Sequence, residues 1–97
     1  ALTRSEIEQI VRIHIKAIAH RLEEQGITLR VNNDAVSFLA EEGYDPDFGA
    51  RPVKRALQQH LLNDLSRAIL GGTVSSAQPI IVEKAEHGLV FKNDTQN

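Results

Sequence analysis

The sequence predicts an α+β fold in which three helices cover one side of a small three-stranded sheet, in the order α-β-α-α-β-β. Three observations predict this fold. Apolar residues recur at helical spacing through 7–22, apolar and polar residues alternate over 27–31, and two short apolar runs follow at 80–82 and 89–91. Because three strands cannot bury both faces of a sheet by themselves, the helices should cover one face.

The first helix is predicted to begin at a capping box. Thr3 is followed three positions later by Glu6, while Ser5 with Glu8 offers an alternative register, and the helix should end before Gly26. One apolar strip at helical spacing consists of Ile7, Val11, Ile15, Ile18 and Leu22. One strip suffices to dock a helix on its own core. A second strip therefore needs another cover, and it consists of Ile10, Ile13 and Ala17, with His14 and Arg21 between the two strips.

The later elements also carry local signals. Residues 27–31 fit a half-buried strand, and Asn32 or Asn33 can cap a helix that ends at Gly43. A compact loop rich in proline and glycine follows over 44–49. Pro52 suits the first position of a third helix, because the amide that it lacks would have had no partner there.

The C-terminal third is predicted to be a hairpin. The third helix should reach Leu70 and end at the two glycines 71–72. The link 85–88 between the last two apolar runs is short enough for an antiparallel hairpin. We therefore expect one domain over 1–93 and a disordered tail over 94–97.

Composition excludes several classes of function. The 97 residues carry 11 basic and 13 acidic side chains, so no positive excess exists to bind nucleic acid. The chain has no cysteine, which excludes disulfides and thiolate metal sites. No apolar run approaches the roughly 20 residues that span a bilayer, and no signal peptide is recognisable. Because the chain starts at Ala1 without methionine, inside a helix-entry signal, we expect it to be an excised fragment.

No self-sufficient active site is recognisable. The sequence has no G-x-x-x-x-G-K-[ST] loop to cradle a triphosphate, and its four histidines lack metal-ligand spacing. The serines have no nucleophile-elbow context, and the acidic residues 41–47 are more typical of a solvated face than of an acid-base pair. The chain alone is not expected to be an enzyme, and none of its residues is predicted to be catalytic or to bind a metal.

One constellation departs from ordinary helix design. Arg51, Lys54 and Arg55 lie at the start of the third helix, where cations are disfavoured by roughly 0.3–1 kcal/mol each. Free amides and converging cations together make an anion site. A planar guanidinium suits phosphate oxygens, and Gly49 with Pro52 restricts the backbone around Arg51. The alternative is that these cations are surface charges balanced by Glu42, Asp45 and Asp47, and spacing alone favours this alternative.

The sequence around these cations resembles the Clp family. Residues 43–56 read GYDPDFGARPVKRA and are similar to the family's G-Y-D-P-x-[FY]-G-A-R-P-[LIV]-[KR]-R segment. Residues 26–29, 38–40 and 88–92 also fall where that family would place them. The resemblance covers nearly the whole chain and is strongest to the C-terminal small domain of ClpB-like disaggregases.

The resemblance implies a concrete function. The family's small domain packs on a large AAA+ domain that binds ATP, and Arg51 matches the second-sensor arginine that reaches the terminal phosphates. Magnesium ligands and the base for the attacking water would lie in the large domain. We expect a cytoplasmic homohexamer that acts on unfolded or aggregated proteins. As weaker members of the nucleotide site we expect Ile10 and Ile13, against the adenine or the large domain, and Ala50, near the base or the ribose. Burial of the second strip of the first helix within its own domain is an equal alternative.

Two other interpretations remain open on the sequence. The chain could be the same domain of a peptidase-associated Clp unfoldase, which a peptidase-docking tripeptide in the preceding large domain would reveal. It could also be a free-standing helical interaction module whose basic helix start binds an acidic partner. In that case the native gene product would begin near Ala1.

Overall fold

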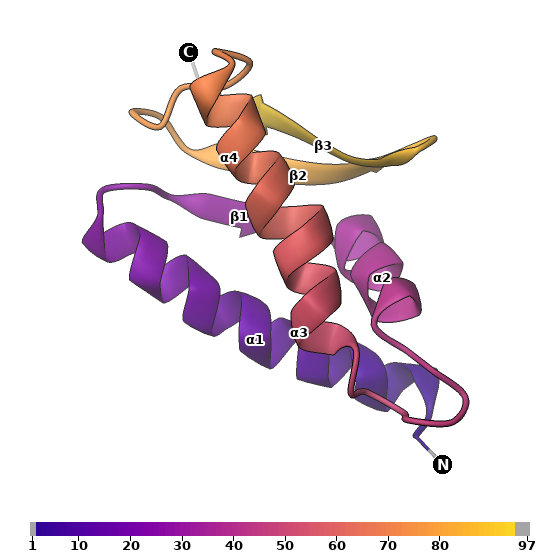
Figure 1. The fold of residues 1–97 in the computed structure, drawn as a ribbon. Coiled ribbons are helices and arrows are strands. Elements are labelled where there is room, and N and C mark those ends of the chain that lie inside the picture. Colours follow the sequence, from indigo (N-terminus) through magenta and orange to yellow (C-terminus); the bar gives the residue numbers. More distant parts are fainter. Residues whose placement is uncertain (1, 95–97) are drawn as a thin grey trace.

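The computed structural model describes residues 2–94. Its elements are α1 Arg4–Glu24, β1 Leu29–Val31, α2 Asn33–Glu42, α3 Val53–Ala56, the π-helical segment η1 Leu57–Leu62, α4 Asn63–Leu70, β2 Ile80–Ala85 and β3 Gly88–Asn93. Because α3, η1 and α4 follow one another without a break, they form a single rod (Figure 1). Over the described residues, the predicted order α-β-α-α-β-β is confirmed.

The sheet combines one parallel and one antiparallel pairing. Its strand order is β1-β2-β3, with Leu29 opposite Ile80 in the parallel pair. The antiparallel pair closes at Ala85 opposite Gly88, so the predicted hairpin is confirmed. The chain between β1 and β2 contains α2 and the rod, which is the long crossover that a parallel pair requires.

The helices pack on one side of this sheet (Figure 1). Leu29, Ile80 and Val82 point toward the helices and are buried. On the opposite face, Arg30 pairs with Asp94 at 3.0 Å and Lys92 pairs with Glu83 at 3.2 Å. The largest fully buried side chains come from all layers: Ile7, Val11, Val36, Leu39, Val53, Leu61, Ile80 and Val82. No polar side chain is buried among the described residues.

Helix α1 begins at the predicted capping box. The hydroxyl of Thr3 accepts from the amide of Glu6 at 3.1 Å, and the amide of Thr3 donates to the Glu6 carboxylate at 2.9 Å. These hydrogen bonds, the backbone one foremost, lower the pKa of Glu6 below its ordinary value. The stabilisation from Glu6 is therefore present above its unfolded-state pKa and is lost as the pH falls through the lowered one. The alternative register at Ser5 is not used.

The remaining helix ends agree with the sequence signals except at the rod. Asn32 caps α2 by accepting from the amide of Ala35 at 2.9 Å, and α2 ends at Gly43. Pro52 stands just before the rod as its capping residue, not at the first helical position. A π-helical turn interrupts the predicted uniform helix, and it contains His60, whose ring meets the ring of Phe38 edge-on at 5.4 Å.

The domain boundary at residue 93 stays a prediction. Asp94, placed in the expected tail, donates its amide to the carbonyl of Pro79 at 2.9 Å in addition to pairing with Arg30. Residues 95–97 lie outside the described residues.

Removing the α1 cap should destabilise the domain. The substitution Thr3→Ala removes the oxygen that accepts from Glu6 and should cost about 1 kcal/mol of the free energy of unfolding. Urea denaturation monitored by circular dichroism measures this change. Thr3→Ser keeps the acceptor and serves as the control; an equal loss in both variants would contradict the cap assignment.

Candidate functional site

The loop before the rod is closed by hydrogen bonds. The Asp45 amide donates to the Gly49 carbonyl at 2.9 Å, and the Gly49 amide donates back to the Asp45 carbonyl at 2.7 Å. The Asp45 carboxylate accepts from the amides of Asp47 at 2.8 Å and Phe48 at 3.2 Å. Gly49 has φ 63°, a left-handed conformation that favours glycine. These hydrogen bonds restrict the backbone conformation of the loop.

A close contact seats the start of the rod against the end of α2. Gly43 is buried, and a Cβ atom at that position would lie 2.8 Å from Cγ2 of Val53 and 3.1 Å from the carbonyl oxygen of Leu39. Only a residue without a side chain allows this approach. Val53, which is 1% exposed, is therefore held at a fixed place, and Arg51 lies two residues before it.

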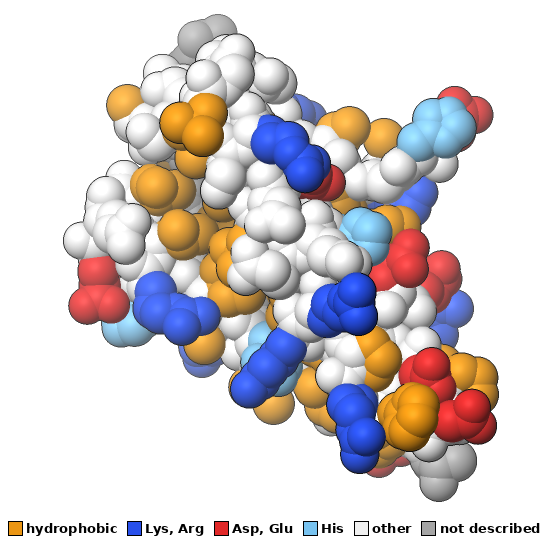
Figure 2. Space-filling view, in the orientation of Figure 1, with side chains coloured by type: hydrophobic (Ala, Val, Ile, Leu, Met, Phe, Trp, Pro, Cys, Tyr) orange, Lys and Arg blue, Asp and Glu red, His pale blue; other side chains and the backbone are white. Residues whose placement is uncertain are grey.

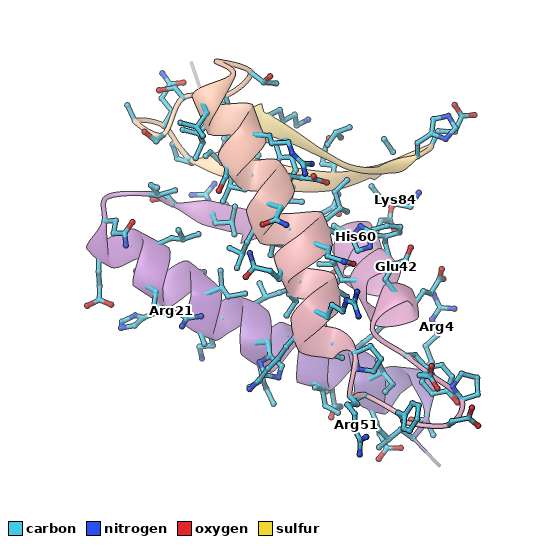
Figure 3. All side chains as sticks on the ribbon, in the orientation of Figure 1. Arg4, Arg21, Glu42, Arg51, His60 and Lys84 are labelled. Atoms are coloured by element: carbon cyan, nitrogen blue, oxygen red, sulfur yellow. The ribbon has the colours of Figure 1, made fainter. Side chains whose placement is uncertain are left out.

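Arg51 extends from the loop at the end of the molecule where the rod begins (Figure 3). Its side chain is exposed, and its amide donates to the carbonyl of Phe48 at 3.2 Å. The central carbon of its guanidinium lies over the Phe48 ring, 5.0 Å from the centroid. Arg51 is thus directed away from the hydrophobic core.

The nearby carboxylates form no ion pair with Arg51 in the part of the chain that the structure describes. Within residues 2–94, no ion pair joins Arg51, Lys54 or Arg55 to a carboxylate. Asp45 instead accepts from loop amides, and Figure 3 shows Glu42 on α2, apart from Arg51. The interpretation that these cations are balanced by local acids is therefore not supported by the geometry.

A groove lies between α1 and the rod, beside the cations at the start of the rod, because Lys54 belongs to its lining. Its volume is about 600 Å³. The lining residues are His14, Ala17, Ile18, His20, Arg21, Lys54, Leu57, Gln58 and Leu62. Apolar side chains and cations share this lining, and no carboxylate belongs to it. Figure 2 shows Lys and Arg side chains gathered on this face, over α3 and the middle of α1.

The weaker predicted site residues have separate positions. Ile13 is 69% exposed and Ala17 is also exposed, so these two residues of the second strip of α1 are not buried within the described domain. Ile10 and Ala50 are partly buried and pack against the core. The groove lining includes neither Ile10 nor Ile13, and Arg51 and Ala50 are also outside it. The structure therefore does not bring these four residues into one pocket.

The groove itself was not predicted from the sequence. The spacing of His14, Ile18 and Arg21 puts them on one face of α1, which was the available signal. The other wall of the groove comes from the rod. The sequence does not show that these two helices, which are far apart along the chain, pack side by side.

The described residues lack two other kinds of feature. They contain no cluster of three or more histidines and carboxylates that could hold a metal ion, and none of their helices is long and apolar enough to cross a membrane. A smaller pocket of about 300 Å³ near Leu2 and Tyr44 is flanked by the ion pair of Arg4 with Glu41 at 2.9 Å.

The fold and the loop before the rod define a small α+β domain of the Clp class. Residues 2–82 match the family described as the C-terminal, D2-small domain, of ClpB protein, and the chain belongs to that family.

Nearly the whole chain is similar to a segment of proteins named ClpB. "Chaperone protein ClpB" of Bacteroides thetaiotaomicron is 50% identical over 92 residues, which are 95% of this chain and 11% of that protein. "Chaperone protein ClpB" of Porphyromonas gingivalis is 44% identical over 96% of the chain and 11% of its own length. "Chaperone protein ClpB 2" of Synechocystis sp. is 43% identical over 93% of the chain and 10% of its own length. The chain thus spans about a tenth of these relatives.

Adding a methyl group at residue 43 should disturb the seat of the rod. Gly43→Ala forces Val53 or the end of α2 to move, at a cost of about 1–3 kcal/mol in the free energy of unfolding. Chemical denaturation measures the cost, with Glu42→Ala as the control at an exposed neighbour. Equal stability of Gly43→Ala and wild type would contradict the close contact.

Proposed function

We propose that this domain supplies Arg51 to the terminal phosphates of an ATP molecule bound by a large AAA+ domain of the same protein. The observation that carries the proposal is the state of Arg51: exposed, held by a hydrogen-bonded loop, and paired with no carboxylate among residues 2–94. Arginine offers five N–H donors in a fixed plane, which suits phosphate oxygens.

The surroundings of Arg51 fit a polyphosphate ligand. Lys54 and Arg55 are exposed beside it, and the adjacent groove adds Arg21 without any carboxylate in its lining. Such a surface attracts negative charge and does not repel it. ATP with magnesium brings that charge, and on this proposal the large domain would supply the magnesium ligands. The domain's own contribution is to position a cation where charge accumulates during phosphoryl transfer.

The parent protein would be an ATP-dependent remodelling chaperone. Support comes from the printed names of the relatives, which are chaperones called ClpB. On this proposal the domain packs on its own large domain and on neighbouring subunits of a homohexamer in the cytoplasm, and aggregated proteins are the substrates. The exposed Ile13 and the partly buried Ile10 and Ala50 would then contact the large domain or the nucleotide base.

The two alternatives differ in what they require of the rest of the protein. A peptidase-associated unfoldase requires a peptidase-docking segment in the large domain, whereas the relatives' names favour the chaperone. A free-standing interaction module would need no nucleotide. The family assignment to a D2-small domain favours a module that works within a larger protein.

Removal of the Arg51 guanidinium should impair ATP use by the full-length protein. Losing a charge-assisted contact with phosphate costs about 1.5–3 kcal/mol, roughly ten- to hundredfold in kcat/KM. Steady-state ATPase kinetics and a separate ATP-binding titration of Arg51→Ala measure this loss. Arg67→Ala is the matched control, because Arg67 is an exposed arginine on the same rod that pairs with Asp64.

Wild-type ATPase kinetics in the Arg51→Ala variant would contradict the proposal and would mean that Arg51 is only a surface charge. Equal losses in Arg51→Ala and Arg67→Ala would point to a general effect of charge, and would also contradict the proposal.

The isolated chain should fold without hydrolysing ATP. It has a continuous core, and its described residues contain no cluster of three or more histidine and acidic side chains that could hold a metal ion. Circular dichroism and a phosphate-release assay on the purified chain test both statements. Hydrolysis that copurifies with the folded chain, and persists after further purification, would mean that the chain contains a catalytic site of its own.

A further inference from the structure

Phe48 is the most exposed of the four aromatic residues of this chain. It is 57% exposed, although its own amide and those of its loop neighbours take part in hydrogen bonds. Tyr44 is 43% exposed, and Phe38 and Phe91 are partly buried. The central carbon of the Arg51 guanidinium lies over the Phe48 ring, 5.0 Å from its centroid.

The loop determines where this ring lies. The Asp45 carboxylate accepts from the Phe48 amide at 3.2 Å, and the Phe48 carbonyl accepts from the Arg51 amide at 3.2 Å. The backbone that carries the ring is therefore linked to the backbone that carries the guanidinium. The two side chains meet because of this link.

We propose that Phe48 is a positioning residue for Arg51: its ring holds the guanidinium in an extended pose before a phosphate arrives. This inference rests on the proposed function. An arginine side chain that is ordered on binding loses rotamer freedom. A ring that restricts the side chain beforehand reduces that loss, and the attraction of the cation to the ring offsets part of it.

The contact leaves the arginine able to bind. The attraction to the ring uses the positive charge, whereas phosphate oxygens accept from the N–H groups. Within residues 2–94 the Arg51 side chain donates no hydrogen bond, so those donors are not already committed. The ring and a phosphate can therefore hold the same guanidinium together.

The first test needs only the chain itself. In nuclear magnetic resonance spectra, the Arg51 side-chain protons of the wild-type chain should be shifted upfield by the ring current of Phe48. Phe48→Leu should abolish the shift, and Phe48→Tyr should retain it. Absence of the shift in the folded wild-type chain would overturn the inference. Thermal unfolding of each variant verifies that the fold is kept.

The second test is a double-mutant cycle in the full-length protein, measured as kcat/KM for ATP. Phe48→Leu should lower kcat/KM about two- to fivefold, the range expected of an exposed cation–π contact. Phe48→Tyr should restore it. In the Arg51→Ala background, Phe48→Leu should have no further effect, because there is no guanidinium left to position.

The outcomes separate the two proposals. If Arg51→Ala lowers kcat/KM but Phe48→Leu is neutral, or lowers it equally in both backgrounds, the positioning role is wrong while the function of Arg51 stands. Equal lowering would mean that Phe48 contacts another part of the protein. If Arg51→Ala itself leaves kcat/KM unchanged, the proposed function fails, and the positioning role toward phosphate fails with it.

Discussion

The architecture of this domain depends on the contact between Gly43 and Val53. There is no room for a side chain at residue 43, because a Cβ atom there would lie only 2.8 Å from Cγ2 of Val53. The contact brings the end of α2 next to the start of the rod. The loop between these two helices must therefore return to its starting point within a few residues. The reciprocal hydrogen bonds of Asp45 with Gly49 close it. This apolar contact thereby helps to position Arg51, which lies in the loop two residues before Val53.

The electrostatics of the site follow from the same geometry. Asp45 and Asp47 precede Arg51 by six and four residues in the sequence, yet the Asp45 carboxylate accepts from loop amides. Neither carboxylate forms an ion pair with Arg51. The basic surface continues into the groove between α1 and the rod, where two helices distant in sequence bring Arg21 and Lys54 to one lining.

Sequence reasoning was most successful where structure is local. The capping residues Thr3 and Asn32, the end of α2 at Gly43 and the C-terminal hairpin each depend on a few neighbouring residues, and all were confirmed. The parallel pairing of β1 with β2 was not predicted, because it depends on a crossover through α2 and the rod.

The π-helical turn at Leu57–Leu62 was also not predicted, since apolar spacing does not distinguish a single widened turn from a regular helix. For the site, the exposure of Arg51 agrees with the hypothesis formed from its motif. The absence of an acidic partner for Arg51 among residues 2–94 could not be predicted, because spacing alone favoured local ion pairs. The positions of Ile10 and Ile13 outside the groove depend on the packing angle of α1, which periodicity does not give.

The most direct measurement is the structure of the full-length protein with magnesium and a slowly hydrolysed ATP analogue. The account predicts the Arg51 guanidinium at about 3 Å from an oxygen of the terminal phosphate, the usual length of a charge-assisted hydrogen bond. A nucleotide-bound structure in which Arg51 is remote from the phosphates, or pairs with a carboxylate, would contradict it.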